Sequence, residues 1–411
     1  MYRENLYPSE QEVVIQVNVI KMIQKKSMGS LFGRLLLLSF LILCFSCNKG
    51  SLDKESVLIK EELSFQLDTV FIDPTQSSQI GFIQISKDKI FYVDQAYGFV
   101  EEFTLEGESG GVKKRELDGP DELQGISELV VKKDGYMIRH DWMFYHYDFD
   151  WKFLGKSNFQ SPATVSFQEL QENPKGEYIE MYELEHYSAK TVQIPGGFLV
   201  TKIDVEHPLF NAFTTREYYR EARVLGKINP FDGEVVEILG ARPKTYEEYA
   251  FVPFHSKFDF HWTGTDRIYM TYEVDSMIYV YDPSWNLIER FGAAGKNMKT
   301  DYEESQILEV AFDTDLYRYS RKNMGYYKDV FVDEQNGLVF RTYRQGTDQQ
   351  DLWDETYNPL RLQIFKDGQL VGDHPVPGRF RILGKIGERY VADGLFDERN
   401  EQQGFYLMTI N

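Results

Sequence analysis

The chain of 411 residues contains only two cysteines, Cys44 and Cys47, and both lie in an apolar segment near the amino terminus. The rest of the chain therefore has no disulfide, no thiolate metal site and no cysteine nucleophile. Basic residues are also scarce, because 45 Lys and Arg stand against 65 Asp and Glu, a formal net charge of −20. A surface of this sign repels nucleic acid and anionic lipid headgroups, and it suits cations, neutral glycans or basic partners.

The sequence also lacks the common catalytic motifs. It has no Gly-x-Ser-x-Gly elbow, no His-Glu-x-x-His, no phosphate-binding P-loop and no EF-hand loop. His140 and His146, like His255 and His261, are six positions apart, which is roughly 20 Å along a strand and too far to share one metal ion. We therefore predict no cofactor. The alternative is a divalent cation that is bound in a central channel of the fold by side chains from distant parts of the sequence.

Long apolar runs are limited to one, Leu35–Phe45, which is eleven residues without a charge. At about 1.5 Å per helical residue the run spans roughly half of a ~30 Å hydrocarbon core, which is typical of a signal peptide. It is followed by Ser46-Cys47, a small residue before a cysteine, which resembles the bacterial lipobox although Cys44 replaces the usual leucine. The resemblance implies cleavage before Cys47 and two or three acyl chains on it, enough for stable anchoring. An ordinary secretory signal is the alternative.

We divide the chain into four parts. Residues 1–27 carry acidic side chains that a signal peptide normally lacks, and they are interpreted as a mis-assigned extension. Residues 28–46 are the signal peptide, residues 47–60 the lipid anchor with a polar tether, and residues 61–411 one folded domain.

Internal repeats predict the fold of that domain. Aromatic residues make up 15% of the chain, and apolar and polar residues alternate from Leu63 onward, which favours half-buried strands. A polar turn followed by a short apolar strand occurs six times, at residues 87–94, 133–140, 195–202, 265–272, 335–342 and 386–393. A strand–turn–strand unit follows each copy, clearest at residues 145–154 and 279–288. Four strands in each of six repeats predict an all-β fold, a six-bladed β-propeller with irregular blades.

The last repeat is one strand short of a complete blade. We predict that Leu63–Ile72, the N-terminal strand of the mature chain, supplies the missing strand and closes the ring, which removes the exposed sheet edges. Insertions are expected at residues 211–223 and 301–327. A large β-sandwich is the alternative architecture.

The lipobox, the short tether and the six Tyr-rich repeats resemble the TolB-like six-bladed propeller lipoproteins of the Bacteroidota, many of which belong to families of unknown function. Asp118-Gly-Pro-Asp-Glu-Leu is similar to a turn that these proteins often carry between blades. The resemblance implies an outer-membrane lipoprotein, because Asn48 is not the aspartate that retains lipoproteins in the inner membrane in the best-known sorting systems. Asp53 and Glu55 are mixed with lysines, so the periplasmic face is favoured over the cell surface.

Three aromatic and basic segments are candidate ligand-binding sites, because propeller loops usually form the binding face. Tyr and Trp rings stack on sugars or peptides, and Arg can hold a carboxylate through two hydrogen bonds. For each segment the alternative is an aromatic blade interior with arginines along its edge. The candidates are Arg139, His140 and Trp142 at the end of one repeat strand, His261 and Trp262 on another strand, and Tyr317, Arg318, Tyr319 and Arg321 in the second insertion.

These features predict a monomeric, membrane-anchored extracytoplasmic lipoprotein whose propeller binds an envelope protein or a glycan, and not nucleic acid. The alternative is a metal-dependent propeller enzyme of the lactonase, lyase or glycosidase type with its site at the central channel. Propellers host both kinds of function, so the fold alone does not choose between them. The lack of a catalytic motif favours binding.

Overall fold

A computed structural model describes residues 53–55, 62–115, 123, 125–205, 207–249, 251–304, 313–349 and 357–411. The chain divides into a unit of residues 1–52 and a unit of residues 53–411, and the described residues all belong to the second. The predicted signal peptide and Cys47 lie outside the described residues, as do most of the tether and most of the turn at residues 118–123. No helix in these described ranges is long and apolar enough to cross a membrane.

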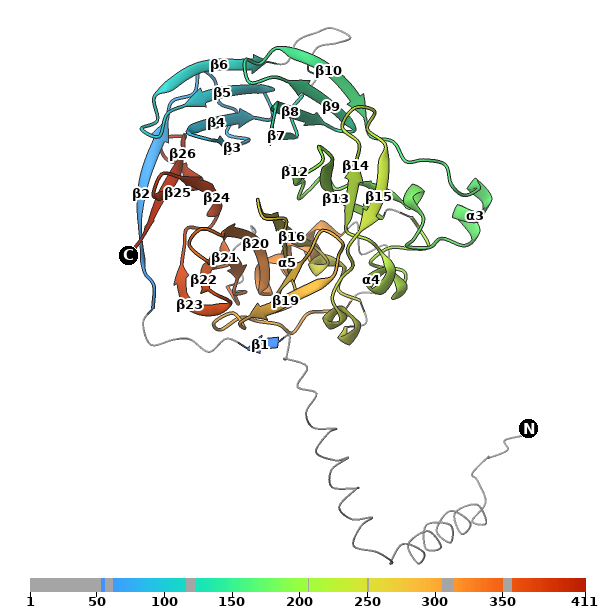
Figure 1. Cartoon of the computed structure of the whole chain (residues 1–411). Helices are drawn as coiled ribbons and strands as arrows, with labels where there is room; N and C mark the ends of the chain where they lie inside the picture. Colours follow the sequence, from blue (N-terminus) through green and yellow to red (C-terminus); the bar gives the residue numbers. More distant parts are fainter. Residues whose placement is uncertain are drawn as a thin grey trace, which may run out of the picture. The chain divides into compact units, whose positions relative to one another are not determined.

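Six β-sheets surround a common centre and form a six-bladed β-propeller, which confirms the predicted fold class (Figure 1). The first three blades contain β3 (Gly81–Ser86), β4 (Lys89–Asp94), β5 (Phe99–Phe103) and β6 (Ser109–Arg115); β7 (Glu128–Lys132), β8 (Gly135–His140), β9 (Met143–Tyr147) and β10 (Phe153–Asn158); and β11 (Tyr182–Leu184), β12 (Thr191–Gln193), β13 (Leu199–Val205), β14 (Leu225–Ile228) and β15 (Val235–Leu239). The last three contain β16 (Phe258–Trp262), β17 (Ile268–Tyr272), β18 (Met277–Tyr281) and β19 (Leu287–Gly292); β20 (Tyr326–Asp333), β21 (Leu338–Arg344), β22 (Leu360–Lys366) and β23 (Gln369–Pro375); and β24 (Arg381–Ile386), β25 (Arg389–Asp397), β26 (Gln402–Ile410) and β2 (Phe65–Ile72).

The six copies of the repeat are the second strands of the blades, β4, β8, β13, β17, β21 and β25. These strands are the most apolar because they have a strand on each side and sheets above and below; every residue of β17 and β21 is buried. The outermost strand β10, in contrast, is mostly exposed or half-buried. The strong repeat signal therefore came from interior strands of the blades, which have a neighbouring strand on each side.

The two clearest strand–turn–strand units have the same turn. The carboxylates of Asp148 and Asp282 each accept backbone N–H groups two and four residues later, at 2.9 Å. Trp151 and Trp285 follow with φ of 63° and 62°, a left-handed conformation that a non-glycine residue adopts only when its surroundings hold it there. The Asp and Trp that align between the two repeats therefore have the same structural role in both turns.

The ring is closed as predicted. β2 pairs antiparallel with β26 along eight residues, from Phe65 opposite Ile410 to Ile72 opposite Gln403. The sequence did not predict that part of the tether also joins a blade: β1 (Asp53–Glu55) pairs in parallel with the outer strand β19.

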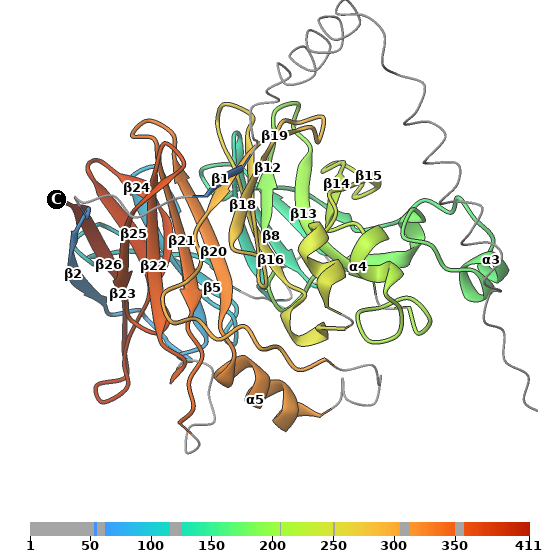
Figure 2. The same ribbon diagram turned by 90° about the horizontal axis from the view of Figure 1, so that it is seen from below.

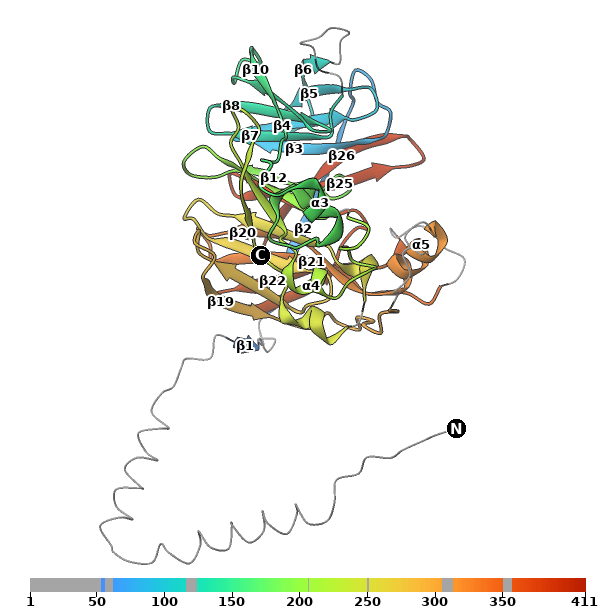
Figure 3. The same cartoon turned by 90° about the vertical axis from the view of Figure 1, so that its right-hand side faces the viewer.

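The helices lie in connections between blades, except α4, which lies between β13 and β14 of the third blade. These are α3 (Phe167–Glu172), α4 (Glu217–Glu221), α5 (Thr314–Asn323) and the 3-10 helices η1 (Ile179–Met181), η2 (Lys244–Glu248) and η3 (Pro253–His255). The carboxylate of Asp313 caps α5 by accepting the N–H groups of Asp315 and Leu316 at 3.1 and 2.9 Å. Figures 2 and 3 show α5 projecting from one face of the ring. We call this the α5 face; the first strand of each blade begins on it and the second strand ends on it.

The largest cluster of buried apolar side chains lies between the third and fourth blades. Tyr219 of α4 stacks on Tyr246 of η2 with ring centroids 5.8 Å apart, and Tyr246 in turn packs edge-on against Tyr272 of β17. The first insertion is therefore anchored by aromatic packing to the fourth blade, and it forms a rigid wall on the α5 face.

Candidate functional site

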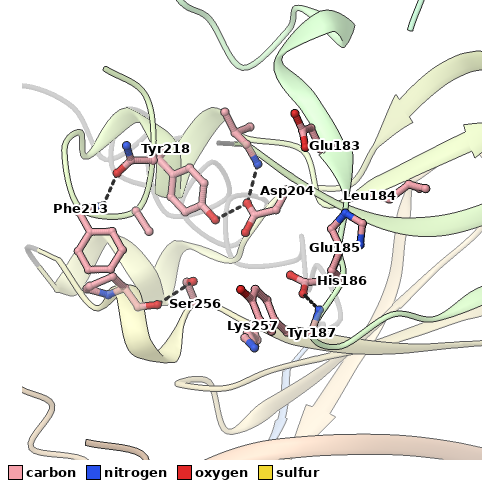
Figure 4. A pocket seen from close by; sticks show the side chains of 14 residues that line it. Glu183, Leu184, Glu185, His186, Tyr187, Asp204, Phe213, Tyr218, Ser256 and Lys257 are labelled. Atoms are coloured by element: carbon pink, nitrogen blue, oxygen red, sulfur yellow. Dashed lines mark hydrogen bonds between the residues drawn. The ribbon is translucent and has the colours of Figure 1, made fainter. Parts of the chain in front are cut away.

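A pocket of about 190 Å³ lies on the α5 face between the third and fourth blades (Figure 4). One wall is residues 183–187, where the innermost strand of the third blade is interrupted: β11 and β12 both pair with β13, and residues 185–190 bulge out between them. The other walls are the end of β13 (Asp204 and Val205), the first insertion (Asn211, Ala212, Phe213 and Tyr218) and the segment before β16 (Pro253, Ser256 and Lys257).

A chain of hydrogen bonds supports Asp204, one of the carboxylates in the pocket wall. The Tyr218 hydroxyl donates to Asp204 Oδ1 at 2.6 Å, and the two groups point toward one another in Figure 4. Arg242 Nη2 donates to the Tyr218 hydroxyl oxygen at 2.6 Å, Arg242 Nε donates to the Ser256 carbonyl at 3.1 Å, and the guanidinium lies 4.3 Å from the Tyr218 ring centroid. Arg242 is buried, so it holds Tyr218 and Asp204 in place from behind the wall.

The surroundings of these groups shift their pKa values. Enclosure by protein raises the pKa of Asp204, against the opposing effects of Arg242 and of the Tyr218 hydroxyl. Burial raises the pKa of Tyr218 well above its usual value, so its hydroxyl keeps its proton. The Asp204 side chain is still 38% exposed. The pocket thus presents an accessible carboxylate whose charged form is destabilised by its enclosure. A cation or a hydrogen-bond donor in the pocket would stabilise that charged form.

The remaining charged groups of the lining are Glu183, Glu185 and Lys257. Glu185 Oε1 accepts the backbone N–H groups of Tyr187 and Ser188 at 2.7 and 3.1 Å, which holds the bulge in shape. Lys257 Nζ lies 5.3 Å from the centroid of the Tyr187 ring. The lining therefore combines three carboxylates, one ammonium group and exposed aromatic surface.

The first candidate segment borders this pocket on the side of the second blade. Arg139 is completely buried; its Nη2 donates to the Glu185 carbonyl at 2.9 Å and its Nη1 lies 3.8 Å from Glu128. Trp142 is 46% exposed and packs edge-on against His186, a lining residue, with ring centroids 5.8 Å apart. Arg139 thus positions the pocket wall, and Trp142 extends the pocket's aromatic rim. His140, the third member, is half-buried, with Nε2 3.6 Å from the Asp141 carboxylate.

The segment on α5 does not line the pocket and is connected to its lining through Phe254. Arg321 is buried and its Nη1 donates to Glu273 at 2.6 Å and to the Phe254 carbonyl at 3.0 Å. Tyr317 packs edge-on against Phe254, and Phe254 against Phe213 of the lining, with centroids 5.6 and 5.8 Å apart. Arg321 is therefore a second buried support of the pocket wall. The other two candidates of this segment, Arg318 and Tyr319, are exposed on α5.

The third candidate segment lies elsewhere. His261 packs against Phe331 at 5.0 Å between centroids, and burial lowers its pKa to about 3, so it stays neutral. Trp262 Nε1 donates to Asp266 at 3.1 Å in the turn after β16. Both residues lie toward the far end of β16 from Lys257, and neither lines the pocket.

Sequence reasoning missed the centre of the site. Asp204, Tyr218 and Arg242 come from a strand end, an insertion and a loop, without a motif that links them. The only signal was the Tyr- and Arg-rich insertion itself, which was expected as an interruption of the repeats and not as part of a site.

We find no metal-binding group of three or more His, Cys, Asp or Glu side chains among the residues that the structure describes. Asp259 of the innermost strand β16 is already paired: it accepts Lys190 Nζ at 2.9 Å and the Val330 N–H at 3.0 Å, with Lys202 Nζ at 3.3 Å. Although burial opposes it, the two lysines lower the pKa of Asp259. This carboxylate is therefore neutralised by the protein itself.

No protein-family model matches the sequence, and no curated protein matches it. Solved structures do share the fold. A member of the DUF4221 family from Bacteroides vulgatus has a TM-score of 0.61 at 13% identity, over 86% of this chain and 99% of the other. A protein from Bacteroides fragilis, named as an exported protein by inference, has a TM-score of 0.50 at 11% identity. The match covers 87% of this chain and 98% of the other. At these identities the likeness concerns the fold alone.

Proposed function

We propose that the protein is a lipid-anchored extracytoplasmic binding module, and that the pocket on the α5 face binds an envelope protein or a glycan. The observation that carries the proposal is the pocket itself, with one sequence-predicted segment in contact with its lining and a second one packed behind it. Each contributes a buried arginine, Arg139 or Arg321, that bonds to a backbone carbonyl of the pocket's surroundings. A concave site on rigid elements, with convergent polar groups and an aromatic rim, is the usual form of a binding site.

The proposed location rests on the sequence. A lipid on Cys47 would hold the propeller at a membrane, and the resemblance to TolB-like lipoproteins favours the periplasmic face of the outer membrane. The name of the Bacteroides fragilis neighbour, which assigns it to exported proteins, supports a place outside the cytoplasm.

Replacement of Cys47 tests the anchor. In a bacterium of the phylum Bacteroidota, Cys47→Ala is expected to lose incorporation of labelled palmitate and to leave the membrane fraction, because no acyl chain remains. Cys44→Ala is the matched control and is expected to retain both. If Cys44→Ala loses the label and Cys47→Ala keeps it, the assigned lipidation site is wrong.

Thermal unfolding with and without ligands tests binding. For the chain from residue 48, a glycan or envelope protein at a hundred times its dissociation constant is expected to add about 2.7 kcal/mol, and to raise the melting temperature by about 3–4 °C. Tyr187→Ala should abolish the shift. Phe231→Ala is the control, because Phe231 is as exposed (91% against 90%) but lies in the turn between β14 and β15 on the opposite face. A melting temperature that falls with chelator and is restored by one divalent ion would favour the metal-dependent enzyme instead.

A further inference from the structure

We infer that the occupant of the pocket is the side chain of an arginine or lysine on a protein partner that lies across the α5 face. This inference rests on the proposed function and names its ligand. It combines three features of the described structure: the charge of the pocket, the shape and chemistry of its walls, and the distribution of exposed aromatic side chains.

The charge of the lining favours a cation. Glu183, Glu185 and Asp204 carry three negative charges and Lys257 one positive charge, which gives −2 with His186 neutral. Buried Arg242 lies behind the wall, 4.0 Å from Asp204, and reaches that carboxylate through the Tyr218 hydroxyl. The lining together with Arg242 is thus still negative by one charge, in a chain whose net charge is −20. An anionic ligand is therefore disfavoured, and a cation gains Coulomb energy in a partly enclosed site.

The walls suit a long side chain with a charged end. Arginine and lysine have an apolar stem and a polar head, which need different surroundings. Phe213 offers apolar surface for a stem, and the carboxylates of Asp204 and Glu185 offer acceptors for a guanidinium or ammonium head. The raised pKa of Asp204 acts in the same direction, because a neighbouring cation relieves the cost of its enclosed charge.

The surroundings of the pocket point to a protein and not to a glycan. Large apolar side chains are exposed on connections of the α5 face that belong to four of the blades and to α5, so they extend well beyond the pocket. Aromatic side chains spread around a central pocket are typical of protein interfaces, which bury about 800 Å² on each partner. A sugar ring in the pocket would leave most of them uncovered. They include Ile80, Tyr97, Trp142, Tyr187, Leu209, Tyr319 and Tyr357.

A titration with small probes tests the inference. N-acetyl-arginine amide is titrated against the lipidated full-length protein in detergent micelles by ligand-observed NMR, with N-acetyl-citrulline amide as the uncharged isostere and methyl hexosides as the glycan probes. We expect the arginine probe to bind in the millimolar range and the citrulline probe at least tenfold more weakly. Asp204→Asn should weaken arginine binding at least tenfold while its amide oxygen still accepts from Tyr218.

Two further variants keep the result interpretable. Glu183→Gln removes a charge from an exposed lining residue and is expected to weaken arginine binding severalfold. This variant provides the test if Asp204→Asn does not fold. Glu234→Gln removes a charge from an exposed turn of the opposite face and should leave binding unchanged.

The outcomes separate this inference from the proposed function. Hexoside binding that depends on Asp204, without arginine binding, overturns the basic partner and keeps the pocket as a glycan site. Arginine binding that neither Asp204→Asn nor Glu183→Gln weakens also overturns the inference. If no probe binds, and no protein or glycan shifts the melting temperature, both the inference and the proposed function fail.

Discussion

Removal of residues 1–72, so that the chain begins after β2, is expected to abolish the cooperative folded state. The last blade would then consist of β24, β25 and β26, and the whole length of β26 would become an open edge that binds other chains. The partly buried Leu67 and Val70 would also no longer pack against the last and first blades. Size-exclusion chromatography should show aggregates, and calorimetry should show no single unfolding transition.

The matched control is a chain that begins at residue 62. It keeps β2 and the hydrogen bond from the Leu63 N–H to the Val371 carbonyl at 2.7 Å, and it lacks only β1, which pairs over three residues. This chain is expected to stay monomeric with one unfolding transition. If the chain from residue 73 behaves in the same way, closure by β2 does not stabilise the ring.

Arg321→Met is expected to lower the free energy of unfolding by about 3–5 kcal/mol, because it leaves the buried Glu273 carboxylate without its ion pair. Both side chains are about nineteen-twentieths buried, at 6% and 5% exposure, and their atoms lie 2.6 Å apart. The guanidinium also covers the Tyr326 ring at 3.6 Å. Chemical denaturation followed by far-UV circular dichroism measures the loss.

A double-mutant cycle separates the ion pair from the packing. Glu273→Gln keeps an acceptor for the Lys257 N–H, which the carboxylate accepts at 3.1 Å, and removes only the charge. The double variant Arg321→Met/Glu273→Gln is expected to lose less free energy of unfolding than the sum of the losses in the two single variants, by about 0.5–3 kcal/mol. Arg318→Met on the exposed side of α5 is the control and should change stability by less than about 0.5 kcal/mol. Additive single effects would show that the ion pair contributes nothing specific.

The blades were predictable because strands and turns are local. Buried second strands such as β17 carry an apolar run that the sequence displays directly, and turn residues such as Asp148 and Trp151 act within five positions of one another. Ring closure was predictable for a related reason. An unpaired strand at one end of the chain can complete the blade that lacks a strand at the other end, and this pairing leaves no exposed sheet edge in the last blade.

The site was only half predictable. None of the segments singled out by composition lines the pocket: the one around Arg139 contacts the lining, the one around Arg321 reaches it only through Phe254, and His261 and Trp262 lie elsewhere. Composition does not distinguish an arginine that faces a ligand from one that is buried. That depends on whether another part of the chain supplies acceptors for the guanidinium, and here they come from carbonyls 46 and 67 positions away.

The sequence by itself therefore determined the all-β repeat architecture, its closure and the acidic character of the surface, because each follows from local patterns or from composition. The tertiary structure alone decided that Asp204, Tyr218 and Arg242 meet, and that the segment around Arg139 contacts the wall of the same pocket. The physical reason is that a propeller brings loops together around a ring, and the position of a loop depends on how every intervening blade packs.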